Sequence, residues 1–103
     1  MGLNVEVIGN MEDASSNYGP VLSSTNQNRI IQHLKSGNTA IIYVLNKFGS
    51  EFAYTQHYMA LLDINENGTK IFVSNPSGTG RKTGWIETTR LFNGAVGAQL
   101  ISK

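Results

Sequence analysis

The chain contains no cysteine in its 103 residues. This absence excludes disulfide bonds, thiolate metal sites and a cysteine nucleophile from the sequence as given. It does not indicate a redox compartment, because a protein without thiols is compatible with all of them.

Charge is also scarce, and neither sign dominates. Charged residues make up 15% of the chain, and the formal net charge is +1. Such a chain has no field that would steer it to nucleic acid or to an anionic membrane, so we expect no nucleic-acid partner. Hydrophobic residues nevertheless make up 40%, many of them β-branched or aromatic, which excludes a disordered segment.

Long hydrophobic runs are missing as well. No stretch approaches the roughly 18 apolar residues of a membrane-spanning helix, so no membrane span is expected in this chain. Met1 leads directly into a strand-like pattern, without the basic leader and apolar core of a signal peptide. This start fits both a natural N-terminus and a truncated piece. Residues 1–103 are therefore expected to be a single domain or a fragment of one, with one modest core.

Periodic apolar residues indicate a mixture of helix and strand. Leu3, Val5 and Val7 alternate with polar residues, which is the pattern of a half-buried strand. Residues 9–24 are polar and rich in turn formers, so they predict a surface loop. Residues 39–45 form a continuous apolar run, which is typical of a strand buried on both faces.

One main helix is predicted between the loop and that run. Thr25 is its candidate N-cap, and its apolar positions are Ile30, Ile31 and Leu34. Gly37 stands where a left-handed helix stop is expected.

A hairpin is predicted further along. Residues 56–64 and 70–75 are strand-like, and the turn-forming run Asn65-Glu66-Asn67-Gly68 joins them. Residues 85–92 indicate a short helical turn or bent segment, and residues 95–102 a last strand. The predicted fold class is α+β, an antiparallel sheet of about five strands with one main helix.

His57 and Asn75 are the candidate catalytic residues. His57 heads the first strand of the hairpin, and Asn75 ends the second. An Asn oxygen can accept a hydrogen bond from one imidazole nitrogen and leave the other free for a thiol, as in a Cys-His-Asn catalytic group. A two-residue turn at Asn67-Gly68 would place the two side chains on opposite faces, whereas an odd-length turn or a bulge would place them on one face.

Each of these residues also has a non-catalytic interpretation. His57 can be a polar residue at a strand entrance, and Asn75-Pro76 a simple strand stop. His33, on the predicted helix, is expected to be a solvated helix residue rather than a metal ligand. The carboxylates are dispersed and show no spacing typical of a metal site or a glycosidase pair, so no metal is expected.

Residues 78–84 are rich in glycine and predict a loop with several turns. They lack the spacing of a phosphate-binding loop. The segment is better interpreted as the rim of a groove, in which Gly78 and Trp85 are candidate contacts for a peptide. The competing interpretation of Trp85 is a core residue, which is the commoner place for a lone tryptophan in a small domain.

In this order, the segments resemble the C-terminal half of the peptidase domain of bacteriocin-processing double-glycine peptidases, within the papain-like cysteine peptidase superfamily. The matching stretches are residues 2–5, 30–42, 57–62, 73–76 and 84–86. In that family a helix ending in Leu-x-x-Gly precedes an apolar strand, a strand headed by histidine and a strand ending in Asp-Pro.

The resemblance implies the sheet half of a papain-like fold and a site without metal or cofactor. His57 would be the general base and Asn75 the orienting residue. The family usually has Asp at that position, and an amide lacks the charge that stabilises an imidazolium. The family's nucleophilic cysteine and its oxyanion-hole glutamine lie in an N-terminal helical part, which this chain lacks. The implied setting is bacterial, either secreted or associated with the cell envelope.

Three functions follow as hypotheses. In the first, the chain is the His/Asn-bearing half of a peptidase that hydrolyses leader or cell-wall peptides only when joined to a cysteine-bearing segment, and is inactive alone. In the second, it is a non-catalytic module that binds a peptide along His57, the 78–84 loop and Trp85. In the third, it is a structural or assembly domain. A surface left apolar by the missing half would favour a homodimer.

Overall fold

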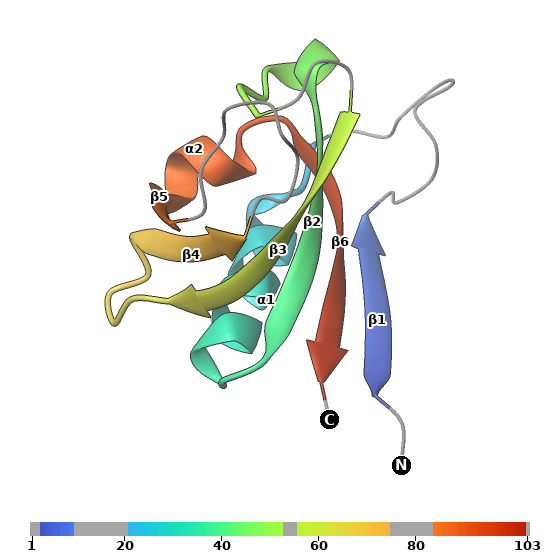
Figure 1. Ribbon diagram of the computed structural model, residues 1–103. Helices are drawn as coiled ribbons and strands as arrows, with labels where there is room; N and C mark the ends of the chain where they lie inside the picture. The colour runs from blue at the N-terminus through green and yellow to red at the C-terminus, as the bar shows by residue number, and fades with distance from the viewer. Residues whose placement is uncertain (1–2, 10–20, 53–55, 75–83, 103) are drawn as a thin grey trace.

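The computed structural model describes residues 3–9, 21–52, 56–74 and 84–102 of the chain. In these residues, six strands form one antiparallel sheet, and two helices lie against one of its faces (Figure 1). The predicted α+β class is confirmed, with one strand more than the five expected. Most of the loop predicted over residues 9–24 lies outside the described residues.

The order of strands in the sheet differs from their order in the chain. Neighbouring strands run β1-β6-β2-β3-β4-β5, so the last strand lies between the first two. The strands are β1 (Asn4–Gly9), β2 (Thr39–Leu45), β3 (Gln56–Ile64), β4 (Lys70–Ser74), β5 (Gly84–Glu87) and β6 (Ala95–Ser102). A short 3₁₀ turn, η1 (Asn46–Phe48), follows β2.

Strand β2 occupies the exact range predicted from its apolar run. Ala40, Ile42 and Val44 point toward the helices and belong to the main core, whereas Tyr43 is buried on the opposite face in a second, smaller cluster. The Tyr43 ring stacks on Tyr58 of β3, with ring centroids 4.4 Å apart. A strand buried on both faces explains why the run contains no charged residue.

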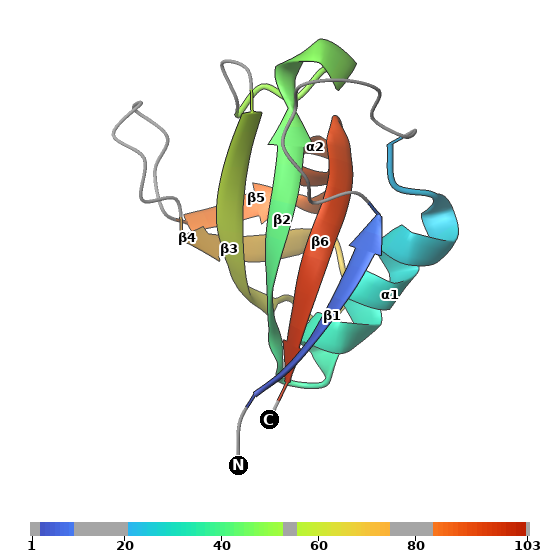
Figure 2. The same cartoon turned by 90° about the vertical axis from the view of Figure 1, so that its right-hand side faces the viewer.

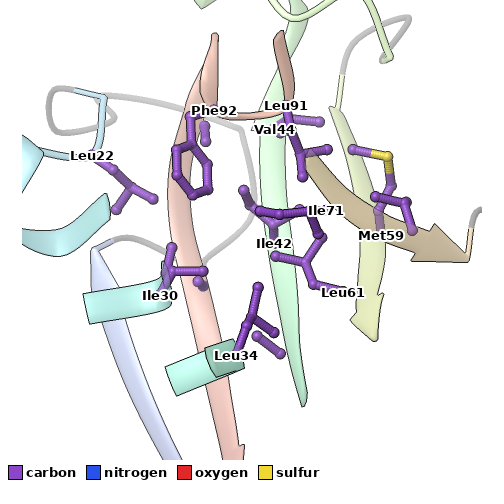
Figure 3. Packing of buried hydrophobic residues seen from close by; sticks show 14 of the residues in the cluster. Leu22, Ile30, Leu34, Ile42, Val44, Met59, Leu61, Ile71, Leu91 and Phe92 are labelled. Carbon is purple, nitrogen blue, oxygen red and sulfur yellow. The ribbon is translucent and has the colours of Figure 1, made fainter. Parts of the chain in front are cut away.

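Helix α1 (Ser24–Lys35) covers the sheet with Ile30 and Leu34, both fully buried. Figure 3 shows these two side chains directed into the core formed by the strands. The N-cap is Ser23, whose Oγ accepts a hydrogen bond from the Asn26 amide at 3.2 Å. The prediction of Thr25 as the cap was therefore wrong by two residues.

The predicted helix stop is confirmed, because Gly37 has a left-handed φ of 87°. Its amide donates to the carbonyl of Leu34 at 3.0 Å, and this bond satisfies one of the last carbonyls of α1.

The segment over residues 85–92 differs from its prediction. Gly84–Glu87 pairs with β4 as strand β5, and only Thr88–Phe92 is helical, as α2. Thr88 links this junction to the β3–β4 turn, because its amide donates to the Thr69 carbonyl at 2.9 Å and its hydroxyl to the Gly68 carbonyl at 2.8 Å. A four-residue strand between glycine and helix is too short for sequence periodicity to reveal.

Strand β1 faces the opposite way from the simplest expectation. Leu3, Val5 and Val7 are 54–63% exposed, and the one buried residue of the strand is Ile8. Glu6, on the same side as Ile8, forms an ion pair with Arg29 of α1. The apolar residues of β1 therefore lie on the sheet face that carries no helix.

Gly94 is required by a close approach of the backbone at the end of α2. It has a φ of 82°, and a Cβ atom there would lie 2.4 Å from the amide nitrogen of Ser50. Its carbonyl accepts a hydrogen bond from Leu45 at 2.9 Å, so the turn before β6 is tied to the end of β2.

We expect Gly94→Ala to destabilise the protein by more than Gly37→Ala. Both positions have a left-handed φ, which costs about 1–2 kcal/mol for a residue with a Cβ. At Gly37 nothing lies within 4 Å of the added atom, whereas at Gly94 it meets backbone. Urea unfolding of the two variants measures the difference, and equal losses would contradict the close packing at Gly94.

Candidate functional site

His57 is the second residue of β3 and lies at one end of the sheet. It pairs with Val44 of β2, and it shares its face with Met59 and Leu61, which are both buried in the main core. Because alternate residues of a strand share a face, His57 is directed to the side of the sheet that carries the helices. Its side chain is half-buried, so this end of the sheet leaves it partly accessible.

The register of the β3–β4 hairpin decides which residues can share the face of His57. Near the turn, Ile64 pairs with Ile71, whereas farther along Ala60 pairs with Ser74, because a bulge occurs between Leu61 and Asp63. The Asn65 amide donates to the Lys70 carbonyl at 3.0 Å, so residues 66–69 form a four-residue turn. The turn is therefore neither the two-residue turn nor an odd-length turn, and a bulge occurs in the hairpin instead.

The bulge lies in β3, shifts the pairing by one residue and reverses which residues of β3 face the core: Ile64 before it, and Leu61 and Met59 beyond it. Beyond it, Leu61 pairs with Val73, and both side chains are buried in the main core. This is the register that the catalytic hypothesis demands. Asn75 itself lies outside the described residues, as does Gly78.

Trp85 lies on the opposite face of the sheet from His57. It pairs with Phe72, and the two rings meet edge to face with centroids 5.4 Å apart. Trp85 is 50% exposed, so the interpretation of it as a core residue was wrong. His57 and Trp85 therefore do not line one groove, and the peptide-binding module loses the arrangement in which both would contact the same peptide.

A hollow that the sequence did not indicate opens at the same end of the sheet as His57. It has a volume of about 350 Å³, and Phe48, Phe92 and Asn93 are among the residues that line it. Val44 pairs with both His57 and Ala95, so those two residues flank β2 about 10 Å apart. Gly94, just before Ala95, is one of the residues that line the hollow. The hollow depends on the pairing of strands far apart in the sequence, so no local sequence motif could have predicted it.

His33 has a structural role instead of the solvated position expected for it. Its Nε2 atom lies 2.9 Å from the carbonyl oxygens of both Thr39 and Ile101. Because carbonyl oxygens only accept, Nε2 carries a hydrogen and donates to them. The ring thus fastens the last turn of α1 to the β2–β6 pair, where Thr39 is opposite Ile101.

We expect His33→Ala to lower the free energy of unfolding by about 1–3 kcal/mol, because two part-buried carbonyls lose a shared donor. His33→Gln should lose less, since its side-chain amide can donate to the same carbonyls. Urea unfolding of both variants provides the measurement. Identical stability of the wild type and both variants would contradict this role.

Other charged side chains stabilise the periphery. The Arg90 guanidinium of α2 donates to both carboxylate oxygens of Glu51, at 2.7 and 3.1 Å. The hydrogen bond to Glu51 and the charge of that carboxylate raise the pKa of Arg90 above its usual value. The pair is exposed, so its contribution to stability is small.

The described part of the chain contains neither a cluster of metal-ligating side chains nor a membrane-spanning helix. Over residues 3–9, 21–52, 56–74 and 84–102, no three His, Asp or Glu side chains gather where they could hold a metal ion. Within the same ranges, no helix is long and apolar enough to cross a membrane.

Comparison of this chain with known protein families, curated proteins and solved structures identified no relative. No family model matches the chain, and neither a curated protein nor a solved structure is significantly similar to it.

Proposed function

We propose that this chain forms the histidine-bearing half of a cysteine-peptidase-like domain. In this proposal His57 is the general base, Asn75 orients its ring, and another segment or chain supplies the cysteine. The chain alone has no thiol and is inactive as a peptidase. The observation that carries the proposal is the bulge between Leu61 and Asp63, which gives the hairpin the required register.

The position of His57 agrees with this role. It lies near the end of an interior strand of the sheet, and regular hydrogen bonding to β2 fixes its backbone. Its side chain is half-buried, so a thiol that approaches this end of the sheet from the helix side can reach it. A rigid strand holds a general base more precisely than a loop does.

The chemistry assigned to His57 is proton transfer in both directions. The imidazole accepts the proton of the incoming cysteine thiol as the sulfur attacks the peptide carbonyl carbon. It then gives that proton to the leaving amine when the C–N bond breaks, which leaves a thioester. In the second half, His57 removes a proton from water, and hydrolysis of the thioester regenerates the thiol.

The hollow beside the turn before β6 supports a peptide as the substrate. Its aromatic walls, Phe48 and Phe92, suit an apolar side chain. Gly94, which also lines it, precedes Ala95, and Ala95 lies about 10 Å from His57 across β2, a distance of about three residues of extended peptide. The resemblance to double-glycine peptidases suggests glycine-type leader junctions or bacterial wall peptides as the substrate classes.

The orienting role of Asn75 can be tested on this chain alone. We expect Asn75→Ala to change the ¹⁵N chemical shifts of the His57 ring, because these shifts report which ring nitrogen carries the proton. The His33 ring serves as an internal reference and should not change. Asn28→Ala, the same substitution at an exposed position of α1, should change neither ring. An unchanged His57 ring in Asn75→Ala would contradict the orienting role.

The catalytic role requires the protein as it occurs in its host, with any segment or partner that accompanies it. There we expect thiol-dependent peptide hydrolysis, and we expect His57→Gln to lower kcat/KM by about 10²–10⁴-fold. His33→Gln is the matched control, because it changes the other histidine of the chain and should keep wild-type activity.

Two results would contradict the proposal. One is hydrolysis that His57→Gln leaves unchanged while circular dichroism shows the variant folded. The other is the absence of any thiol-dependent hydrolysis in the natural assembly.

A further inference from the structure

The sheet face without helices, here called the outer face, carries an uncharged and largely apolar surface. Figure 2 shows strands β1, β6, β2 and β3 from this side, with α1 and α2 behind them. Strand pairing aligns its side chains in rows, such as Val7 beside Gln99 and Ile41. We define the outer patch as Leu3, Val5, Val7, Thr39, Ile41, Ala60, Leu62, Gln99 and Ile101.

The outer patch contains no charged residue, although it extends over four strands. Asp63, which follows Leu62 in β3, borders it, and Lys70 and Glu87 lie on the same face where β4 pairs with β5. Four members of the patch, all aliphatic, are more than 40% exposed: Leu3, Val5, Val7 and Leu62. A patch of this kind on a small domain indicates an interaction surface rather than scattered exposed residues.

The segment that would supply a cysteine to His57 does not explain this patch. His57 is directed to the helix side of the sheet, in line with Met59 and Leu61. The outer patch lies on the other side of the same strands. A thiol donor docked at His57 would leave the patch exposed, so the patch needs a different occupant.

We propose that this occupant is a second copy of the chain, packed outer patch against outer patch about a two-fold axis. A surface without charge is complementary to itself, because no like charges meet across the axis. Sheets that pack face to face keep their strands within about 30° of each other, which suits an axis running roughly along the strands.

The area agrees with a weak, reversible dimer. Four strands of about 5 Å width each and the length of the paired strands give a face of roughly 20 by 20 Å. With the relief of the side chains, this corresponds to about 1,000 Å² buried over both copies, the lower limit for a specific interface. We therefore expect a dissociation constant in the range of about 10–100 µM.

Gln99 offers the sharpest test, because it lies on β6 in the middle of the patch, between Val7 and Ile41. Sedimentation equilibrium from about 10 µM to about 1 mM should show a monomer–dimer equilibrium for the wild type. Gln99→Lys brings two buried like charges together across the axis and should raise the dissociation constant at least about tenfold. Asn28→Lys adds the same charge on exposed α1 and should leave the equilibrium unchanged.

The same experiment separates this dimer from its alternatives. Pairing of two β1 edges would leave Gln99 exposed, so dimerisation unaffected by Gln99→Lys would overturn the proposal. A wild type that stays monomeric to the highest concentration would also overturn it, as would a monomer that sediments with phosphatidylcholine vesicles. Because the helix side is not involved, Gln99→Lys should not affect the His57 ring, so a failure here and a failure of the peptidase proposal are distinguishable.

Discussion

The pairing of β2 with both of its neighbours is the constraint on which the rest of the structure depends. Val44 is opposite His57 on one side and opposite Ala95 on the other. These pairs bring together residues that are far apart in the sequence, and they place the start of β3 and the turn before β6 at the same end of the sheet. The backbone of β2 is hydrogen-bonded along both edges, so a proline-rich sequence could not occupy this position. Its side chains are buried on both faces, so a charged sequence could not occupy it either.

The two faces of this sheet have different chemistry. On one face, α1 and α2 cover a core that contains Ile30, Leu34 and Leu91, and His57 lies at the margin of that core. On the other face, aliphatic side chains of β1 remain exposed, and the described residues of β1, β6 and β2 place no charge there; Asp63 of β3 lies at its border. We propose proton transfer by His57 on the first face and burial against a second copy of the chain on the other. A peptidase half that also self-associates would use both faces without competition between them.

Most of the secondary structure could be predicted from the sequence, and the errors have identifiable causes. Strands β2, β3 and β6 have the predicted bounds, because their apolar runs are long and turn-forming residues flank them. The cap was misplaced because Ser23 and Thr25 are both good caps and only the geometry selects one. Strand β5 was missed because it has four residues. Trp85 was interpreted either as a peptide contact or as a core residue, because the size of a side chain does not reveal the face it occupies; the core interpretation failed.

The candidate site was predictable only in part, because it depends on the parity of strand pairing. The sequence indicated His57 at a strand entrance, but the side to which it points follows from its pairing with Val44. The β3–β4 bulge has no signature in the sequence, since bulges form where the twist and packing of the whole sheet favour an extra residue.

The sequence by itself determined the local elements: which stretches are helix or strand, where glycine must end a helix, and that no thiol is present. Local propensity and apolar periodicity act over a few residues, so they can be seen without the fold. Only the tertiary structure decided the strand order, the side of the sheet that His33, His57 and Trp85 occupy, and the uncharged outer face. These features depend on contacts between residues far apart in the chain, and a shift of one residue in pairing moves every side chain of a strand to the other face.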